Sequence, residues 1–531
     1  MHLHRTLAQR IISQITASQW ALSRRTLCSQ RTLCWAASAT LLSCSTSVLA
    51  DKANDTLVYA SDSEPENVSP YHNNLREGVI LAHLAWDTLI YRNPETNEYE
   101  PRLATEWEWV DDQTLDLALR EGVTFHNGEA FNADDVVFTF NYAVSPESRV
   151  VTRQNVNWIE SAEKLDDFQV RIHLKDPFPA ALEYLSGPMP IYPSEYFQEV
   201  GIEGFSRQPV GTGPYRITNV RPGDGVSLTR FEEYFTDSPI GQPEIGNIEF
   251  KAIADEDSRM AQLMSGQVDW IWRVPADQAE SLSSMPQLSV LGGETMRVGY
   301  IGLDAATRED SPLNDIRVRQ AINHAMNREG LANDLVRGGS QPLYAPCFPT
   351  QFGCETQNVI EYEYDPEKAR ELLAEAGYAD GFDISLHAYR ERDYAEAMIG
   401  DLRAVGINAN LRFMTSPALL ELQRNGQTDM SFKAWGSFSI NDVSAFVSVY
   451  FSGGIDDLWQ DSQVQEWLQI ADTSVDPDVR LDYYQQVLAR ISEQAYWAPL
   501  FSYSTYYAHT ADLDFTAYPD ELPRFYEASW K

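Results

Sequence analysis

Residues 382–414 read FDISLHAYRERDYAEAMIGDLRAVGINANLRFM, and this stretch decides the fold class. Its first eight residues alternate apolar and polar side chains, which predicts a β-strand over 382–389. YAEAMIGDLRAVG at 394–406 predicts a helix stopped by its glycine, and INANLRFM at 407–414 predicts a second strand. Strand, helix and strand in this order form a βαβ unit, whose crossover is right-handed.

The same alternation of strands and helices continues along the chain. We expect strands at 55–61 (DTLVYAS) and 114–121 (TLDLALRE), and helices at 78–90 (GVILAHLAWDTLI), 132–144 (NADDVVFTFNYAV) and 365–377 (DPEKARELLAEAG). Asn132 and Asp365 are expected to cap the last two helices. The pattern predicts an α/β protein, and 531 residues are enough for two or three domains.

The first 50 residues predict a signal peptide. They contain five arginines and no acidic residue, then a mostly apolar stretch over 32–44, then SVLA before Asp51. A basic, an apolar and a small-residue region in this order predict export with cleavage after Ala50. Two variants remain open: LLSC at 41–44 resembles a lipoprotein box that would lipidate Cys44, and SRRTL at 23–27 resembles a twin-arginine signal.

Charge and cysteine content narrow the function further. The formal net charge of −38 argues against a nucleic-acid partner, because the chain would repel a phosphate backbone. After the signal peptide, the cysteines are Cys347 and Cys354 in CFPTQFGC, which predicts a small-loop disulfide in an exported protein. The sequence has no HExxH or GxSxG motif, so we expect neither an enzyme nor a cofactor.

Five motifs in register resemble one family, the family 5 solute-binding proteins of ABC importers. They are residues 103–140 (LATEWEWVDDQTLDLALREGVTFHNGEAFNADDVVFTF), 209–217 (PVGTGPYRI), 263–275 (LMSGQVDWIWRVP), 313–329 (LNDIRVRQAINHAMNRE) and 364–378 (YDPEKARELLAEAGY). The resemblance implies a two-lobed periplasmic-binding-protein fold with a hinge, a cleft and an extra subdomain in the first lobe. It divides the chain into 1–50 (signal peptide), 51–75, 205–297 and 499–531 (lobe I), 76–204 (inserted subdomain) and 298–498 (lobe II), with crossings near 299–304 and 498–503.

The resemblance also places three segments at the cleft: 61–67 (SDSEPEN), 388–394 (AYRERDY) and 435–442 (WGSFSIND). Peptide-binding members carry an Asp a few residues after the Trp, which neutralises the peptide ammonium. Here Phe438 or Ser439 fills that position, and Asp442 aligns with a structural turn residue. The candidate ligand-binding residues are Asp62, Glu64, Tyr389, Arg390, Arg392, Trp435, Ser437, Ser439, Asn441 and Tyr503.

These candidates favour an anionic solute, because an arginine fork binds a carboxylate through two parallel hydrogen bonds. We expect a monomeric periplasmic receptor that captures a peptide or a carboxylated amino-acid derivative, opine-like or a modified peptide. It would deliver this solute to the permease of an ABC importer in the inner membrane. The alternatives are a receptor for nickel or a metal chelate, for which His387 lies near the expected cleft, and more remotely a secreted hydrolase.

Overall fold

The computed structural model describes residues 52–531 except 66, 74 and 305–309, and the side chain of Phe438 is also not described. The signal peptide, its cleavage after Ala50 and the Cys44 alternative therefore lie outside the described residues. Within the described residues, the helices are too short or too polar to cross a bilayer.

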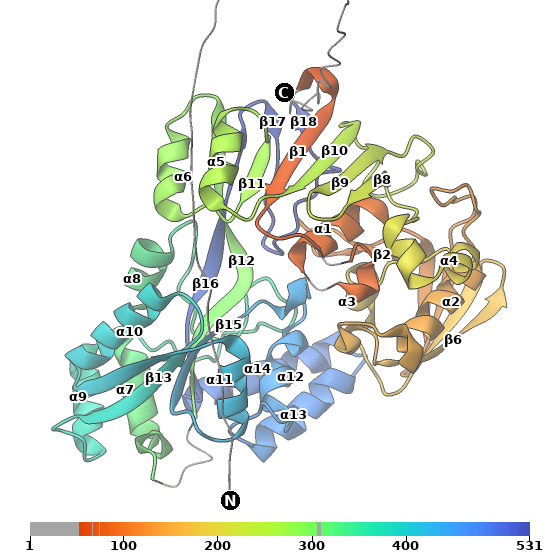
Figure 1. Ribbon diagram of the computed structural model, residues 1–531. Coiled ribbons are helices and arrows are strands. Elements are labelled where there is room, and N and C mark those ends of the chain that lie inside the picture. The colour runs from red at the N-terminus through yellow and green to blue at the C-terminus, as the bar shows by residue number, and fades with distance from the viewer. Residues whose placement is uncertain (1–51, 66, 74, 305–309) are drawn as a thin grey trace, which may run out of the picture. The chain divides into compact units, whose positions relative to one another are not determined.

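A ten-stranded mixed sheet runs through the described chain (Figure 1). Its order is β14 (Ile407–Phe413), β13 (Phe382–Ala388), β15 (Met430–Trp435), β12 (Leu288–Leu303), β16 (Trp497–Thr510), β11 (Trp270–Trp272), β1 (Thr56–Ser61), β10 (Asn247–Ala252), β9 (Gly225–Arg230) and β8 (Tyr215–Arg221). The long antiparallel pair β12 and β16 joins the two sides of this sheet, with Gly299 opposite Phe501. The predicted crossings near 299–304 and 498–503 overlap these two strands, and both the crossings and the lobe boundaries stay predictions.

The predicted βαβ unit is present. Strands β13 and β14 pair in parallel from Phe382–Ile407 to Ala388–Phe413, and α10 (Arg392–Ala404) connects them. Gly406 has a φ of +96°, a left-handed conformation that favours glycine, so it ends the helix as predicted. The helix begins two residues earlier than its apolar pattern indicated.

Separate groups of helices cover different parts of the sheet. The helices α7 (Ile316–Ala325), α9 (Pro366–Glu375) and α10 belong with β13 to β15 to one apolar cluster. A second cluster contains α12 (Val447–Phe451), α13 (Ser462–Thr473) and α14 (Pro477–Glu493), and a third contains α5 (Glu256–Met264) and α6 (Ala276–Ser283). The short helices α8 (Arg328–Gly330) and α11 (Ser416–Arg424) lie between these elements in the chain. Asp365 caps α9 as predicted, since its carboxylate accepts from the amide of Lys368.

A smaller antiparallel sheet lies within the predicted inserted subdomain. It has the order β4 (Ala104–Asp111), β5 (Thr114–Leu119), β7 (Gln169–Leu174) and β6 (Ile159–Asp166). The helix α2 (Ala133–Val144) packs on it, and a reciprocal capping box between Asn132 and Asp135 starts this helix as predicted. The remaining elements are α3 (Ala181–Ser186), α4 (Ser194–Arg207) and the pairs β2 (Ile90–Arg92) with β3 (Tyr99–Pro101) and β17 (Leu513–Asp514) with β18 (Ser529–Trp530).

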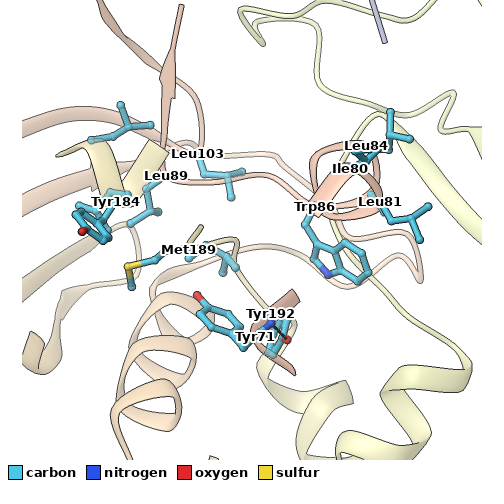
Figure 2. Close-up of a cluster of buried hydrophobic side chains, with 14 of the residues drawn as sticks. Tyr71, Ile80, Leu81, Leu84, Trp86, Leu89, Leu103, Tyr184, Met189 and Tyr192 are labelled. Carbon is cyan, nitrogen blue, oxygen red and sulfur yellow. Dashed lines mark hydrogen bonds between the residues drawn. The ribbon is translucent and has the colours of Figure 1, made fainter. Parts of the chain in front are cut away.

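The helix α1 (Arg76–Ala85) ends earlier than the predicted range of 78–90. Trp86 has extended backbone angles, and its buried indole donates a 3.0 Å hydrogen bond to the carbonyl of Val210. Figure 2 shows this ring beside Ile80, Leu81 and Leu84 of α1, within the core of the first half of the chain. The apolar residues after 85 therefore do not continue the helix. Trp86 enters the core, and Ile90 starts strand β2.

Candidate functional site

A cavity of about 380 Å³ lies beside α1. Its wall combines α1, the end of β15 with the turn after it, and the chain terminus around 520–526. Six described residues of the lining are arginines, namely Arg76, Arg92, Arg102, Arg273, Arg297 and Arg524. The acidic residues of the lining are Glu77, Glu183 and Asp520. A cavity of this size suits a small solute.

The sequence of α1 explains how one helix serves both the core and the cavity. Ile80, Leu81 and Leu84 are buried in the apolar cluster, whereas Val79 and His83 line the cavity. Residues three and four positions apart lie on one side of a helix, so these two sets occupy different sides. The helix therefore holds its cavity-facing residues against a rigid core.

The stretch WGSFSIND supplies part of the opposite wall. Trp435, Ser437 and Ser439 line the cavity, and their role as ligand contacts stays a prediction. Strand β15 ends at Trp435, whose indole donates to the carbonyl of Ala445 at 2.9 Å. Ser437 and Ser439 then have φ angles of 44° and 67°, a left-handed backbone that few non-glycine residues adopt. This tight 3-10 turn places both hydroxyl-bearing residues beside the cavity.

The same stretch contacts both the first half of the chain and the C-terminal segment. The Ser439 hydroxyl donates to the carbonyl of Asp520 at 2.6 Å and accepts from Arg76 at 2.8 Å. The backbone amide of Asn441 donates to the Glu183 carboxylate at 2.7 Å. Asn441 itself lies next to the cavity but outside its described lining. Asp442 has the structural role that its alignment predicted, because it caps the next turn and pairs with Arg480 at 2.8 Å.

Carboxylates hold the cavity arginines in place. Arg92 pairs with Glu183 at 3.1 Å, and Arg524 pairs with Asp520 at 2.6 Å. Three further carboxylates lie behind the lining: Asp87 contacts Arg102 at 2.5 Å, Asp62 contacts Arg273 at 3.0 Å, and Glu521 contacts both Arg76 and Arg297 at 3.5 and 3.2 Å. The six arginines thus line the cavity, while three of these five carboxylates do not line it.

The ionisation of the lining follows from this arrangement. Burial alone would raise the pKa of Asp520, but Arg524 and Arg92 outweigh it and lower this pKa to about 2. Burial raises the pKa of Glu183 even though Arg92 opposes the shift. His83 keeps some surface toward the cavity, and burial, Arg524 and Arg102 together lower its pKa to about 3.

Seven of the ten sequence-based candidates lie outside the cavity lining, and four of these come from the segment 389–392 and from β16. Arg390 pairs with Glu391 at 2.5 Å and stacks over the ring of Tyr503 at 4.6 Å, and the Tyr503 hydroxyl donates to the same carboxylate. Arg392 pairs with Glu396 at 3.6 Å, and 57% of its side chain is exposed. The Tyr389 hydroxyl contacts the carbonyl of Ala434 at 3.4 Å. Their role as ligand contacts stays a prediction.

The remaining candidates divide between the cavity and its surroundings. Asp62 lies behind the lining through its pair with Arg273, and Glu64 accepts from the amide of Gly223 at 2.8 Å. His387 is buried in β13, with Nδ1 3.3 Å from the carbonyl of Met430.

The sequence did not single out the six cavity arginines. They are spread from 76 to 524, and none of them lies in a segment that the family resemblance places at the cleft. One signal for them was available in the sequence: the helix at 76–83 carries Arg76 and His83 on the side away from its apolar residues.

The structure joins Cys347 and Cys354 in a disulfide with a Cα–Cα distance of 5.8 Å, as predicted. Among the residues that the structure describes, histidine, cysteine and acidic side chains do not gather in a group of three or more that could hold a metal ion.

The sequence matches the family described as bacterial extracellular solute-binding proteins, family 5 Middle, over residues 98–457. The chain belongs to this family. This solute-binding protein is 27% identical over 438 residues to the glutathione-binding protein GsiB of Salmonella paratyphi A, covering 79% of this chain and 84% of the relative. It is 30% identical over 320 residues to the GsiB of Pectobacterium atrosepticum, covering 57% and 58% of the two chains.

Solved structures agree with the fold. HbpA2 from Haemophilus parasuis superposes with a TM-score of 0.79 at 26% identity, over 90% of this chain and 100% of that chain. NikA from Brucella suis in complex with Fe(III)-EDTA gives a TM-score of 0.78 at 24% identity, over 90% and 100% of the two chains. The predicted periplasmic-binding-protein fold is therefore confirmed. The protein is a solute-binding component of an ABC transporter and not an enzyme.

Proposed function

We propose that this protein captures a carboxylated, peptide-like solute in the periplasm and delivers it to an ABC permease in the inner membrane. The observation that carries the proposal is the lining of the cavity, where six arginines face three acidic residues. Carboxylates in and beside the lining offset these charges, but six guanidinium groups stand at one cavity of a chain with net charge −38, so the average composition does not account for them. Guanidinium groups bind carboxylates through paired, charge-assisted hydrogen bonds.

The surroundings of the arginines suit a peptide-like solute. Trp435 offers a flat ring, and the Ser437 and Ser439 region offers hydroxyl and backbone groups that hydrogen-bond to polar ligands. Relatives at about 27% identity are named for binding glutathione, which is a carboxylated tripeptide. Contacts from the turn at 437–441 to Glu183, Arg76 and Asp520 are of the kind that closure around a solute would make.

A metal chelate is the second candidate. His83 lines the same cavity and its pKa is low, so its imidazole is neutral and able to bind a metal ion. The arginine lining would also accept the carboxylates of an anionic chelator. The absence of a cluster of metal-binding side chains in the described part of the chain makes the free ion the less favoured form.

Isothermal titration calorimetry with a panel of probes tests the proposal. The panel contains glutathione, an acidic dipeptide such as Glu-Glu, a neutral dipeptide, a lysine dipeptide, and nickel with and without a polycarboxylate chelator. We expect the acidic peptides to bind and the lysine dipeptide to fail, because the arginines would repel its added positive charge. Binding of nickel chelate alone would favour the second candidate. Preferential binding of the lysine dipeptide would overturn the proposed function.

A further inference from the structure

The cavity turn, residues 437–440, is held by a loop that does not itself line the cavity. This loop is the segment 347–354 (CFPTQFGC), which the disulfide between Cys347 and Cys354 closes. Within it, Gln351 is 4% exposed and stands outside the cavity lining. A residue in this position acts on a solute only through the turn that it contacts.

The side-chain amide of Gln351 joins the loop to the cavity turn. Its Nε2 donates to the hydroxyl oxygen of Ser437 and to the carbonyl of Ile440, both at 3.0 Å. The carbonyl can only accept, so the nitrogen of this amide must face the turn. Its Oε1 accepts from the backbone amide of Phe348 at 3.0 Å, which fixes the side chain within its own loop.

Two backbone hydrogen bonds extend this connection to the residues after the turn. The Phe352 amide donates to the carbonyl of Asn441 at 3.0 Å, and the Val443 amide donates to the carbonyl of Phe352 at 2.9 Å. Gly353 packs closely beside them, because a Cβ added there would lie 2.6 Å from atoms of Tyr484 and Val443. The loop is therefore fixed against the chain that follows the turn.

The cavity turn needs this support because its backbone is strained. Ser437 and Ser439 have φ angles of 44° and 67°, and non-glycine residues keep such angles only where surrounding contacts fix them. The Ser439 hydroxyl contacts Arg76 at 2.8 Å, so the conformation of the turn also affects an arginine of the lining. A relaxed turn would shift both serines, which line the cavity themselves.

We propose that Gln351 is a positioning residue for the solute, and that the disulfide-closed loop holds the cavity turn in its binding conformation. This inference rests on the proposed function, because the solute must occupy the cavity. Without the two donors of Gln351, the turn gains other conformations, and only a fraction of the free protein is competent to bind. The apparent affinity falls by that fraction.

Gln351→Met tests the inference, because methionine has a similar length and lacks the amide. Calorimetry with glutathione and with Glu-Glu measures the dissociation constants, and Glu-Glu has no thiol that could exchange with the disulfide. We expect binding to weaken about tenfold or more, as the competent fraction falls by this factor. Hydrogen exchange at the amides of 439–441 should become faster in the free variant. A folded variant that binds as tightly as the wild type would overturn the inference while the proposed function stands.

Asn323→Leu is the matched control, because Asn323 is a buried amide with the same kinds of contact outside the cavity lining. Its Nδ2 donates to the carbonyls of Arg319 and Trp497, both at 3.2 Å, and its Oδ1 accepts from Arg328 at 2.7 Å. This variant should lose stability in thermal unfolding and still bind within about twofold of the wild type, since its competent fraction is unchanged. An equal loss of affinity in both variants would overturn the inference, because general destabilisation would then explain it.

The double variant Cys347→Ser and Cys354→Ser tests the loop while keeping the donors of Gln351. Opening the loop gives Gln351 more positions, so both probes should bind more weakly than to the wild type and more tightly than to Gln351→Met. This double variant also decides the question if Gln351→Met does not fold. Wild-type affinity in the double variant would overturn the role of the loop. If the wild type binds neither glutathione nor Glu-Glu, the proposed function fails and the inference fails with it.

Discussion

The carboxylate of Glu183 accepts a 2.7 Å hydrogen bond from the backbone amide of Asn441, 258 positions away in the chain. Glu183 also pairs with Arg92 at 3.1 Å and accepts from the Tyr99 hydroxyl at 3.1 Å. This single buried side chain therefore connects the turn beside the cavity with the first half of the protein.

The first prediction concerns the stability that Glu183 provides. Replacing Glu183 by Ala should lower the free energy of unfolding by about 3 kcal/mol, because it leaves Arg92 buried with a lost partner. Glu183→Gln should cost less, since an amide oxygen can still accept from Asn441. Urea denaturation measures both effects, and the exposed Glu203→Ala is the control. Equal stabilities of Glu183→Ala and the control would contradict the prediction.

A second prediction separates the cavity from the site that the sequence favoured. Arg297→Gln should weaken an anionic solute by about 2 kcal/mol, because a cation facing the bound carboxylate is lost. Arg392→Gln should change the dissociation constant little, since this side chain is 57% exposed and outside the lining. Calorimetry with glutathione measures both. The reverse order of effects would return the ligand to the segment 388–394.

The ionisation of Asp520 gives a prediction about acid stability. Its pKa is lowered to about 2 in the folded protein, below the ordinary value of 3.8, so its charge stabilises the fold above about pH 4. This contribution is lost as the pH falls from about 4 to 2, and it amounts to about 2 kcal/mol. Asp520→Asn lacks the charge at every pH, so its stability should fall less than that of the wild type across this window. Unfolding curves at several pH values measure the difference, and parallel curves would contradict it.

Solute binding should also change His83. An anionic solute in the cavity offsets the charges of Arg102 and Arg524 that disfavour the imidazolium, so the pKa of His83 should rise from about 3 on binding. Proton NMR of the histidine rings with and without glutathione measures this shift. The exposed His173, which pairs with Glu163 on the small sheet, serves as the internal control. A shift at His173 alone would place the ligand elsewhere.

The disulfide also gives a prediction about stability. Cross-linking Cys347 to Cys354 restricts the unfolded chain, which for so short a loop is worth about 2 kcal/mol. Replacing both cysteines by serine should lower the stability by this amount and make it insensitive to reductant. Thermal unfolding with and without dithiothreitol compares the two proteins, and an unchanged wild-type midpoint under reductant would contradict the expectation.

Local patterns in the sequence determined the elements of this fold and its family. The alternation at 382–389, the capping residues Asn132 and Asp365 and the glycine at 406 act over a few residues, so the chain reveals them directly. The pattern misled at 86–90, where apolar residues continued a helical period although Trp86 turns into the core. The burial of this ring depends on a carbonyl that is distant in the sequence. The spacing of apolar residues along the chain contains no information about such a contact.

The cavity was decided by the tertiary structure. Trp435, Ser437 and Ser439 could be found because the family resemblance covers that turn. The six arginines could not, because they come from six separate places in the chain and line one cavity only when the tertiary structure brings these places together. Their charges are held toward the cavity by carboxylates such as Glu521, whose position depends on contacts hundreds of residues away. A sequence specifies which side chains carry charge, and the packed structure decides which of them line the same cavity.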